Sequence, residues 1–161
     1  MNLGRAVSWS DGPVGLRRRL WLLLPAVVLF GCDVGLTLAE QTPEYWLGDY
    51  QQATEHNPLG RPLLAWHPIA FIGAAAAWGA AFSAVVLLWR HPLGGWLAVA
   101  LAVGHAFGAS SWLARHGVVG WASALCYVAV AAWVLRICWG RAAAEGEPDS
   151  TTPGAIPNRT A

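Results

Sequence analysis

Residues 66–89 read WHPIAFIGAAAAWGAAFSAVVLLW, a stretch with no aspartate, glutamate, lysine or arginine. A helix of about 20 apolar residues is long enough to cross the ~30 Å hydrocarbon core of a bilayer. A single strand could not replace it, because the strand's backbone groups would stay unpaired in lipid. This stretch therefore predicts a membrane-spanning helix.

Three more apolar blocks of similar length lie at residues 20–38, 93–114 and 118–139. Hydrophobic residues make up 56% of the 161 residues and charged residues only 12%, whereas a soluble domain has roughly 25% charged residues. The connections between the last three blocks are very short, which makes these spans antiparallel neighbours. We predict an all-α fold: one integral membrane four-helix antiparallel bundle at residues 20–139.

The chain has ten arginines and no lysine, and the arginines flank the spans unevenly. Eight of them fall on the side of the chain ends, and only Arg61 and Arg115 fall on the other side. The positive-inside rule then predicts that both termini are cytoplasmic, with a basic tail at 1–19 and a disordered tail at 140–161. The arginine-rich, lysine-free composition is typical of a GC-rich bacterium, so we expect the bacterial inner membrane. The net charge of +1 gives no sign of nucleic-acid binding.

The outer loop at 39–65 contains a helix start at Thr42-Pro43-Glu44, with an N-cap residue, a proline and an acid in order. We expect this helix to run to about Glu55 and to end before Pro58. It would lie at the membrane surface as a short interfacial helix.

The first span has an alternative interpretation. Arginines 17–19, an apolar run and Leu29-Phe30-Gly31-Cys32 are similar to a lipoprotein signal, in which Cys32 would be lipidated and become the mature N-terminus. Phe30 fits that pattern poorly and the apolar run continues to Ala39, which favours an uncleaved span. The three cysteines are an odd number in apolar segments, which argues against a disulfide framework.

Two ionisable residues lie inside predicted spans, where such groups are costly and usually face the bundle interior. Asp33 lies about 8 Å and His105 about 13 Å from the outer ends of their spans, at 1.5 Å per residue. Gly31 and Gly35 frame Asp33, while Gly104 and Gly108 frame His105. Since small residues allow close helix approach, we expect the first and third spans to pack around an Asp33–His105 contact.

Other polar residues extend this pair toward the outer surface. Thr37 lies one turn beyond Asp33, His67 opens the second span, and Glu55 to Asn57 end the predicted surface helix. The candidate polar pocket therefore contains Asp33, Thr37, Glu55, Asn57, His67 and His105. Three interpretations are open. The polar residues form a hydrogen-bonded pair that only packs the helices, or a site for a ligand, proton or ion. Alternatively, Asp33, Glu55, His67 and His105 form a metal site, since their carboxylate and imidazole groups suit zinc.

Two short motifs, Asp33-Val34-Gly35-Leu36-Thr37 and Glu55-His56-Asn57-Pro58, resemble an uncharacterised family of small prokaryotic membrane proteins. That family carries Asp-x-x-x-Thr and Glu-x-Asn-Pro patterns, and the resemblance covers about residues 20–115. This chain departs from it in a longer outer loop that contains Tyr45-Trp46. The resemblance implies no activity, but it implies that Asp33, Thr37, Glu55, Asn57 and Pro58 belong to one feature.

These patterns favour a non-enzymatic accessory or small-ligand-binding protein that needs no cofactor. Its expected partners are the lipid bilayer and a membrane protein or a second copy of the chain. Two alternatives remain: a metal-assisted intramembrane hydrolase that uses a divalent metal such as zinc, and a proton-coupled carrier with Asp33–His105 as its relay.

Overall fold

A computed structural model describes residues 15–89, 91 and 93–145. Of the predicted tails at 1–19 and 140–161, the parts at 1–14 and 146–161 lie outside the described residues. The described residues contain α-helices and one short 3-10 helix, and no strand. The four long helices are α1 (Leu16–Ala39), α4 (Pro68–Leu88), α5 (Leu93–Leu113) and α6 (Gly117–Ala144). In the described part of the chain, these four are long and apolar enough to cross a membrane.

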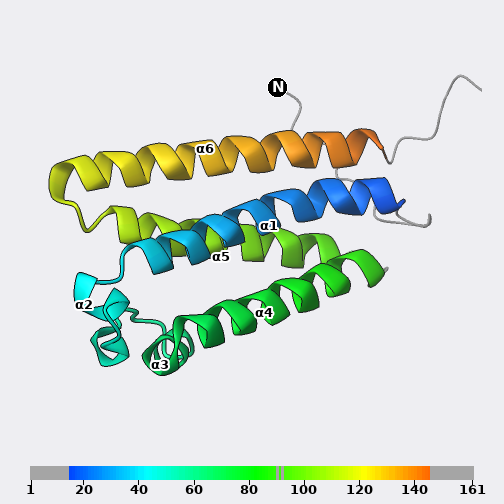
Figure 1. Cartoon of the computed structure of the whole chain (residues 1–161). Helices are drawn as coiled ribbons and strands as arrows, with labels where there is room; N and C mark the ends of the chain where they lie inside the picture. The colour runs from blue at the N-terminus through cyan, green and yellow to red at the C-terminus, as the bar shows by residue number, and fades with distance from the viewer. Residues whose placement is uncertain (1–14, 90, 92, 146–161) are drawn as a thin grey trace, which may run out of the picture.

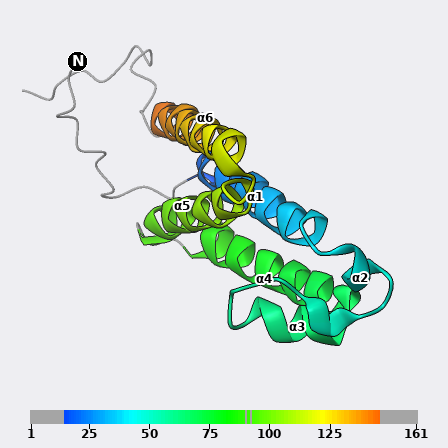
Figure 2. The ribbon, with the colours of Figure 1, turned by 90° about the vertical axis from the view of Figure 1, so that its left-hand side faces the viewer.

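The four long helices form an antiparallel bundle with α1 at its centre (Figure 1). Helix α1 packs against α4, α5 and α6, whereas α4 and α6 lie on opposite sides of the α1–α5 pair (Figure 2). The predicted contacts between consecutive spans, α4 with α5 and α5 with α6, are present. Helices α1 and α5 run in the same direction, because α4 returns the chain across the bundle between them (Figure 1).

Small residues on α5 let α1 approach closely. The buried residues along this face of α5 are Gly94, Gly95, Ala98, Ala102, Ala106 and Ala109, with Trp112 at its end. The predicted role of Gly31, Gly35 and Gly104 is wrong, since a Cβ atom added at any of them would meet nothing within 4 Å. Close approach depends instead on the alanines and on Gly108, which faces α1.

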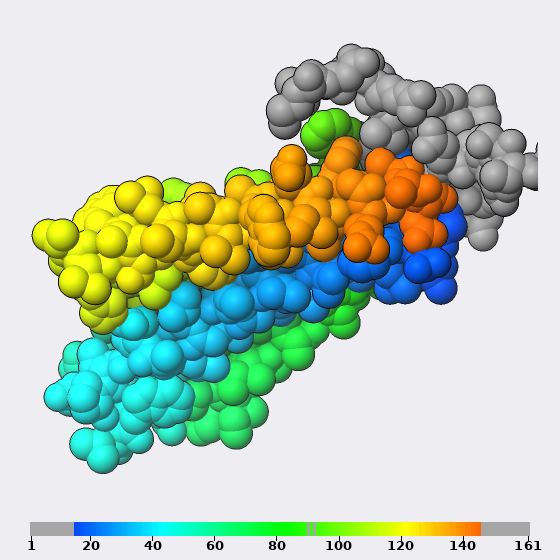
Figure 3. All heavy atoms as spheres, turned by 90° about the horizontal axis from the view of Figure 1, so that it is seen from above, coloured from blue at the N-terminus to red at the C-terminus, as the bar shows by residue number. Residues whose placement is uncertain are grey.

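The outer face of α6 carries many large apolar residues that are more than half exposed, among them Val118, Trp121, Leu125, Val130 and Trp133. Helix α6 lies across one face of the molecule, with α1 and the segment after it alongside (Figure 3). An apolar surface that extends along a whole helix is typical of contact with lipid chains. The fold is therefore that of a membrane helical bundle.

The three consecutive arginines before the predicted first span, Arg17 to Arg19, belong to α1, which begins at Leu16, earlier than expected. Arg17 Nε lies 3.0 Å from Glu145 Oε1 beyond the end of α6, and Arg19 Nη1 donates to the Leu87 carbonyl oxygen of α4 at 2.5 Å. Helix α6 likewise runs to Ala144, into the predicted tail. Helices α1 and α6 are thus both longer than predicted, and charged residues at their ends make polar contacts with neighbouring helices or with the residue that follows α6.

Residues 40–67 form a compact unit at one end of the bundle, which we call the cap. The predicted surface helix from Pro43 to Glu55 is wrong: the cap contains α2 (Pro43–Trp46), η1 (Tyr50–Gln52) and α3 (Gly60–Trp66). Thr42 caps α2 as expected, by accepting a hydrogen bond from the Tyr45 backbone. The helix ends after one turn because Gly48 takes a positive φ of 107°, a conformation that glycine adopts without strain.

Tyr45 is the centre of the cap, and its side chain is fully buried. Its hydroxyl donates to the Leu64 carbonyl oxygen of α3 at 3.2 Å. Burial, and then the neighbouring Tyr50, raise the pKa of the Tyr45 hydroxyl above its usual value. The hydroxyl therefore keeps the proton that it donates, and α2 stays joined to α3.

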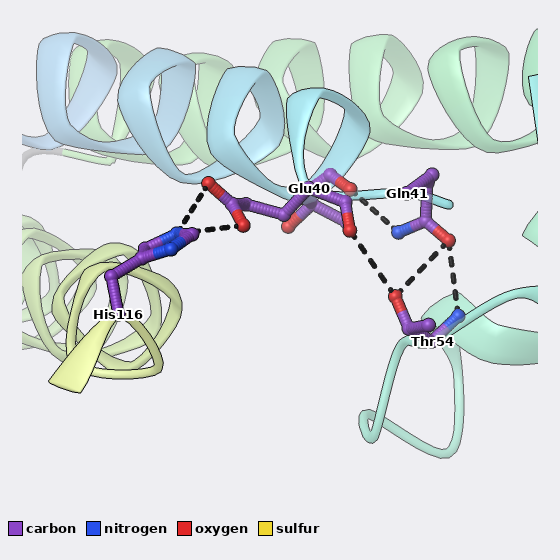
Figure 4. A network of polar contacts seen from close by, with 5 residues as sticks. Glu40, Gln41, Thr54 and His116 are labelled. Carbon is purple, nitrogen blue, oxygen red and sulfur yellow. Dashed lines mark hydrogen bonds and ion pairs between the residues drawn. The ribbon is translucent and has the colours of Figure 1, made fainter. Parts of the chain in front are cut away.

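Polar contacts fasten the cap to the bundle where α1 ends (Figure 4). Gln41 is buried; its Nε2 donates to the Thr37 carbonyl oxygen at 2.6 Å, and its Oε1 accepts from the Thr54 backbone at 3.0 Å. The Glu40 carboxylate accepts from His116 Nε2 at 2.9 and 3.0 Å. The end of α1 thus holds both the cap and the start of α6.

Candidate functional site

The predicted Asp33–His105 contact is present between the two central helices. His105 Nδ1 lies 2.9 Å from Asp33 Oδ2, and the two side chains are only 19% and 21% exposed. The carboxylate accepts this hydrogen bond, so Nδ1 carries the proton and, in the neutral ring, Nε2 is an acceptor. The pair therefore joins α1 to α5 and orients one imidazole in the apolar part of the bundle.

Gly108 and two phenylalanines shape the surroundings of this pair. The Asp33 carboxylate lies directly against the α5 backbone, since a Cβ atom on Gly108 would fall 2.6 and 2.8 Å from its two oxygens. The His105 ring packs edge-on against Phe30 at 4.9 Å between centroids and lies 6.5 Å from Phe82 of α4. These apolar contacts exclude water on one side, which strengthens the hydrogen bond.

Tyr127 of α6 joins this site, although the sequence interpretation did not include it. Its hydroxyl lies beside the Cys32 thiol of α1, with which it has a side-chain hydrogen-bond contact, and it interacts electrostatically with Asp33. The hydroxyl oxygen is buried and has no nitrogen or oxygen partner among the described residues, and the neighbouring Cys32 thiol is only a weak hydrogen-bonding group. The only signal in the sequence was a phenol within an otherwise apolar span. The site thus consists of Asp33, His105 and Tyr127, from three different helices, and we call it the polar cluster.

The other predicted pocket residues make contacts elsewhere. Thr37 is buried in α1 one turn from Asp33. Glu55 Oε1 accepts from the Asn57 backbone at 2.6 Å, and Asn57 Oδ1 accepts from the Leu59 backbone at 2.9 Å. His67 Nδ1 accepts from the Ile69 backbone at 3.1 Å and so caps α4. Glu55, Asn57 and His67 therefore order the cap instead of extending the Asp33–His105 pair.

The metal set predicted from the sequence is not assembled. Within residues 15–89, 91 and 93–145, no three His, Cys, Asp or Glu side chains form a group that could hold a metal ion. Glu55 and His67 belong to the cap, while Asp33 and His105 bond each other. The structure therefore does not bring Asp33, Glu55, His67 and His105 together among the described residues.

Comparison with known proteins adds no assignment, since no family model, no curated protein and no solved structure matches the chain.

Proposed function

We propose that this is a non-enzymatic membrane protein that binds a small polar ligand at the polar cluster. The observation that supports it is the buried Tyr127 hydroxyl, which has only the weak Cys32 thiol beside it and no nitrogen or oxygen partner in the described structure, next to an ordered Asp33–His105 pair. Buried polar groups nearly always have a hydrogen-bond partner, and the need is greater where no bulk water is present. A bound polar molecule would supply that partner.

The three groups offer complementary contacts to such a ligand. The Asp33 carboxylate accepts hydrogen bonds, while the Tyr127 hydroxyl can donate or accept. The Asp33–His105 hydrogen bond fixes the carboxylate before anything binds, so less conformational freedom is lost on binding. A ligand with both a donor and an acceptor fits this arrangement best.

Replacing Tyr127 by phenylalanine distinguishes a ligand site from a packing contact. If a polar ligand bonds the hydroxyl, Tyr127→Phe lowers the melting temperature and removes a ligand adduct from the native mass spectrum. Loss of one hydrogen bond to a buried polar partner is expected to cost about 1–3 kcal/mol. Ser110→Ala is the matched control, because the Ser110 hydroxyl bonds its own helix at Phe107 and its loss should leave the adduct intact.

The opposite outcome would reject the proposal. A buried hydroxyl that truly has no partner destabilises the protein, so its removal would then raise the melting temperature. If Tyr127→Phe is more stable than the wild type and the wild-type protein carries no adduct, the polar cluster only packs the helices together.

We also propose that the cap faces the outside of a bacterial inner membrane and that both termini are cytoplasmic, because of the arginine distribution. With the three native cysteines replaced by alanine, Leu47→Cys in the cap should react with a membrane-impermeant maleimide in intact cells. Leu47 is 89% exposed. Ala144→Cys, at the opposite end of the bundle, should react only after permeabilisation. The reverse pattern would invert the proposed orientation.

The resemblance to the uncharacterised family remains a prediction. It implies that Asp33, Thr37, Glu55, Asn57 and Pro58 belong to one feature, of which Glu55 and Asn57 make turn contacts within the cap, and it adds no activity.

A further inference from the structure

The cap contains a groove that is separate from the polar cluster. The groove has a volume of about 560 Å³, which lies within the range of about 300–1,000 Å³ that is usual for small-molecule sites. Its walls come from η1 and α3, with Gly48 at the turn between α2 and η1. The side chains that give it chemical character are Asp49, Tyr50, Gln51 and Trp66.

The two walls are held in place by contacts behind them. The Tyr50 ring packs edge-on against buried Tyr45 at 5.4 Å and against His67 at 5.0 Å. Gln51 Nε2 donates to the Ala65 carbonyl oxygen at 3.2 Å and so ties η1 to α3. Because η1 and α3 are fixed relative to each other, the groove has its shape before a ligand arrives, which favours binding.

The lining combines aromatic rings with a carboxylate. Trp66 is 75% exposed, so much of its indole is open to a ligand, and Tyr50 forms a second aromatic surface. Asp49 adds a negative charge, and no described residue that lines the groove is basic. Aromatic faces attract cations through their ring quadrupoles, and a carboxylate adds to that attraction.

The charge of the whole cap favours the same kind of ligand. Its acidic residues are Glu40, Glu44, Asp49 and Glu55, and its only arginine is Arg61. An acidic surface raises the local concentration of cations and lowers that of anions. A metal ion is a poor match, since a single carboxylate gives too few oxygen ligands for a hard divalent cation.

We infer that this groove binds an organic ammonium group, with Trp66 and Tyr50 against the cation and Asp49 as its counter-charge. The ammonium belongs either to the headgroup of an amine-bearing lipid or to a free soluble amine. This site lies outside the polar cluster and does not depend on the ligand proposed there.

The probe is choline, measured by saturation-transfer NMR on the full chain in a maltoside detergent, which carries no ammonium. Its neutral isostere 3,3-dimethyl-1-butanol is the comparison, because it has the same shape without the charge. Since the aromatic rings and the carboxylate both act on the positive charge, we expect choline to bind about tenfold more tightly than the isostere. Equal binding of the two compounds would overturn the inference.

Two variants locate the site. Trp66→Leu is expected to weaken choline binding about two- to fivefold, as befits loss of a partly exposed cation–π contact, and Asp49→Asn should weaken it similarly. Trp46→Leu is the matched control, because Trp46 is an exposed tryptophan of the cap that does not line the groove. Unchanged affinity in Trp66→Leu, or equal loss in Trp46→Leu, would overturn the inference.

Further measurements distinguish a loss of choline binding from a loss of folding, and a lipid headgroup from a soluble amine as the natural ligand. The three groove and control variants, Trp66→Leu, Asp49→Asn and Trp46→Leu, must keep the helical circular dichroism and melting temperature of the wild type. Tyr127→Phe, which alters only the polar cluster, should bind choline normally at a temperature where it is folded. In nanodiscs of phosphatidylglycerol, choline should bind. In nanodiscs of phosphatidylethanolamine, loss of choline binding identifies the lipid headgroup as the ligand, whereas equal binding identifies a soluble amine. Absence of binding in both kinds of nanodisc would overturn the inference.

Discussion

Replacing Gly108 by alanine is expected to destabilise the bundle by about 1–3 kcal/mol, the usual cost of adding a methyl group to a tightly packed interface. The new methyl carbon would fall 2.6 and 2.8 Å from the Asp33 carboxylate oxygens. The carboxylate would have to turn away, which also breaks the hydrogen bond to His105. Interhelical hydrogen bonds of this kind contribute roughly 0.6–2 kcal/mol. Unfolding followed in detergent by circular dichroism measures the combined loss.

Gly104→Ala is the matched control, one turn away on the same helix. A Cβ atom at Gly104 meets nothing within 4 Å, and alanine is the better helix former by about 1 kcal/mol. We therefore expect Gly104→Ala to be as stable as the wild type or more so. Equal stability of the two alanine variants would mean that α1 and α5 are not held as closely at Asp33 as the structure shows.

Replacing Tyr45 by alanine is expected to have a comparable or larger effect that is confined to the cap. Truncation of a fully buried aromatic side chain costs about 3–5 kcal/mol, and here the Leu64 carbonyl oxygen also loses its donor. Since 1.4 kcal/mol corresponds to tenfold, backbone amides of α2 and α3 should exchange with deuterium at least about 100-fold faster. Amides of α5 should keep their protection, because Tyr45 makes no contact that orders α5.

Two further variants test this interpretation of the cap. Trp46→Ala removes the neighbouring aromatic ring, which is 53% exposed, and it should leave exchange in α3 nearly unchanged. Tyr45→Phe keeps the ring and loses only the hydroxyl, so its effect should be intermediate. If Tyr45→Ala unfolded the whole chain in one step, the cap and the bundle would be a single cooperative unit.

The membrane spans could be predicted from the sequence because length and hydrophobicity determine them locally. The helix ends were less predictable. The charged residues at 17–19 look like a cytoplasmic tail, yet Arg19 reaches the Leu87 carbonyl oxygen of α4, a partner 68 residues away. Only the packed structure reveals such a partner, so the helix boundaries required the fold.

Only part of the candidate site could be predicted from the sequence, because the other part depends on contacts between residues far apart in the chain. Asp33 and His105 were recognised because an ionisable residue in a span needs a partner, and few were available. Tyr127 was missed, since a tyrosine in an apolar span is ordinary until its hydroxyl is known to be buried. Glu55 and His67 were assigned to the pocket by their place in the chain, whereas turn and capping contacts hold them in the cap.

The central position of α1 has a consequence for synthesis of the protein. Asp33 leaves the ribosome 72 residues before His105, its hydrogen-bond partner, an interval of roughly 4–14 s at 5–20 residues per second. During that time, the first helix carries a carboxyl group whose partner does not yet exist. During co-translational insertion, the insertion machinery therefore has to accommodate this carboxyl group in α1 until α5 arrives.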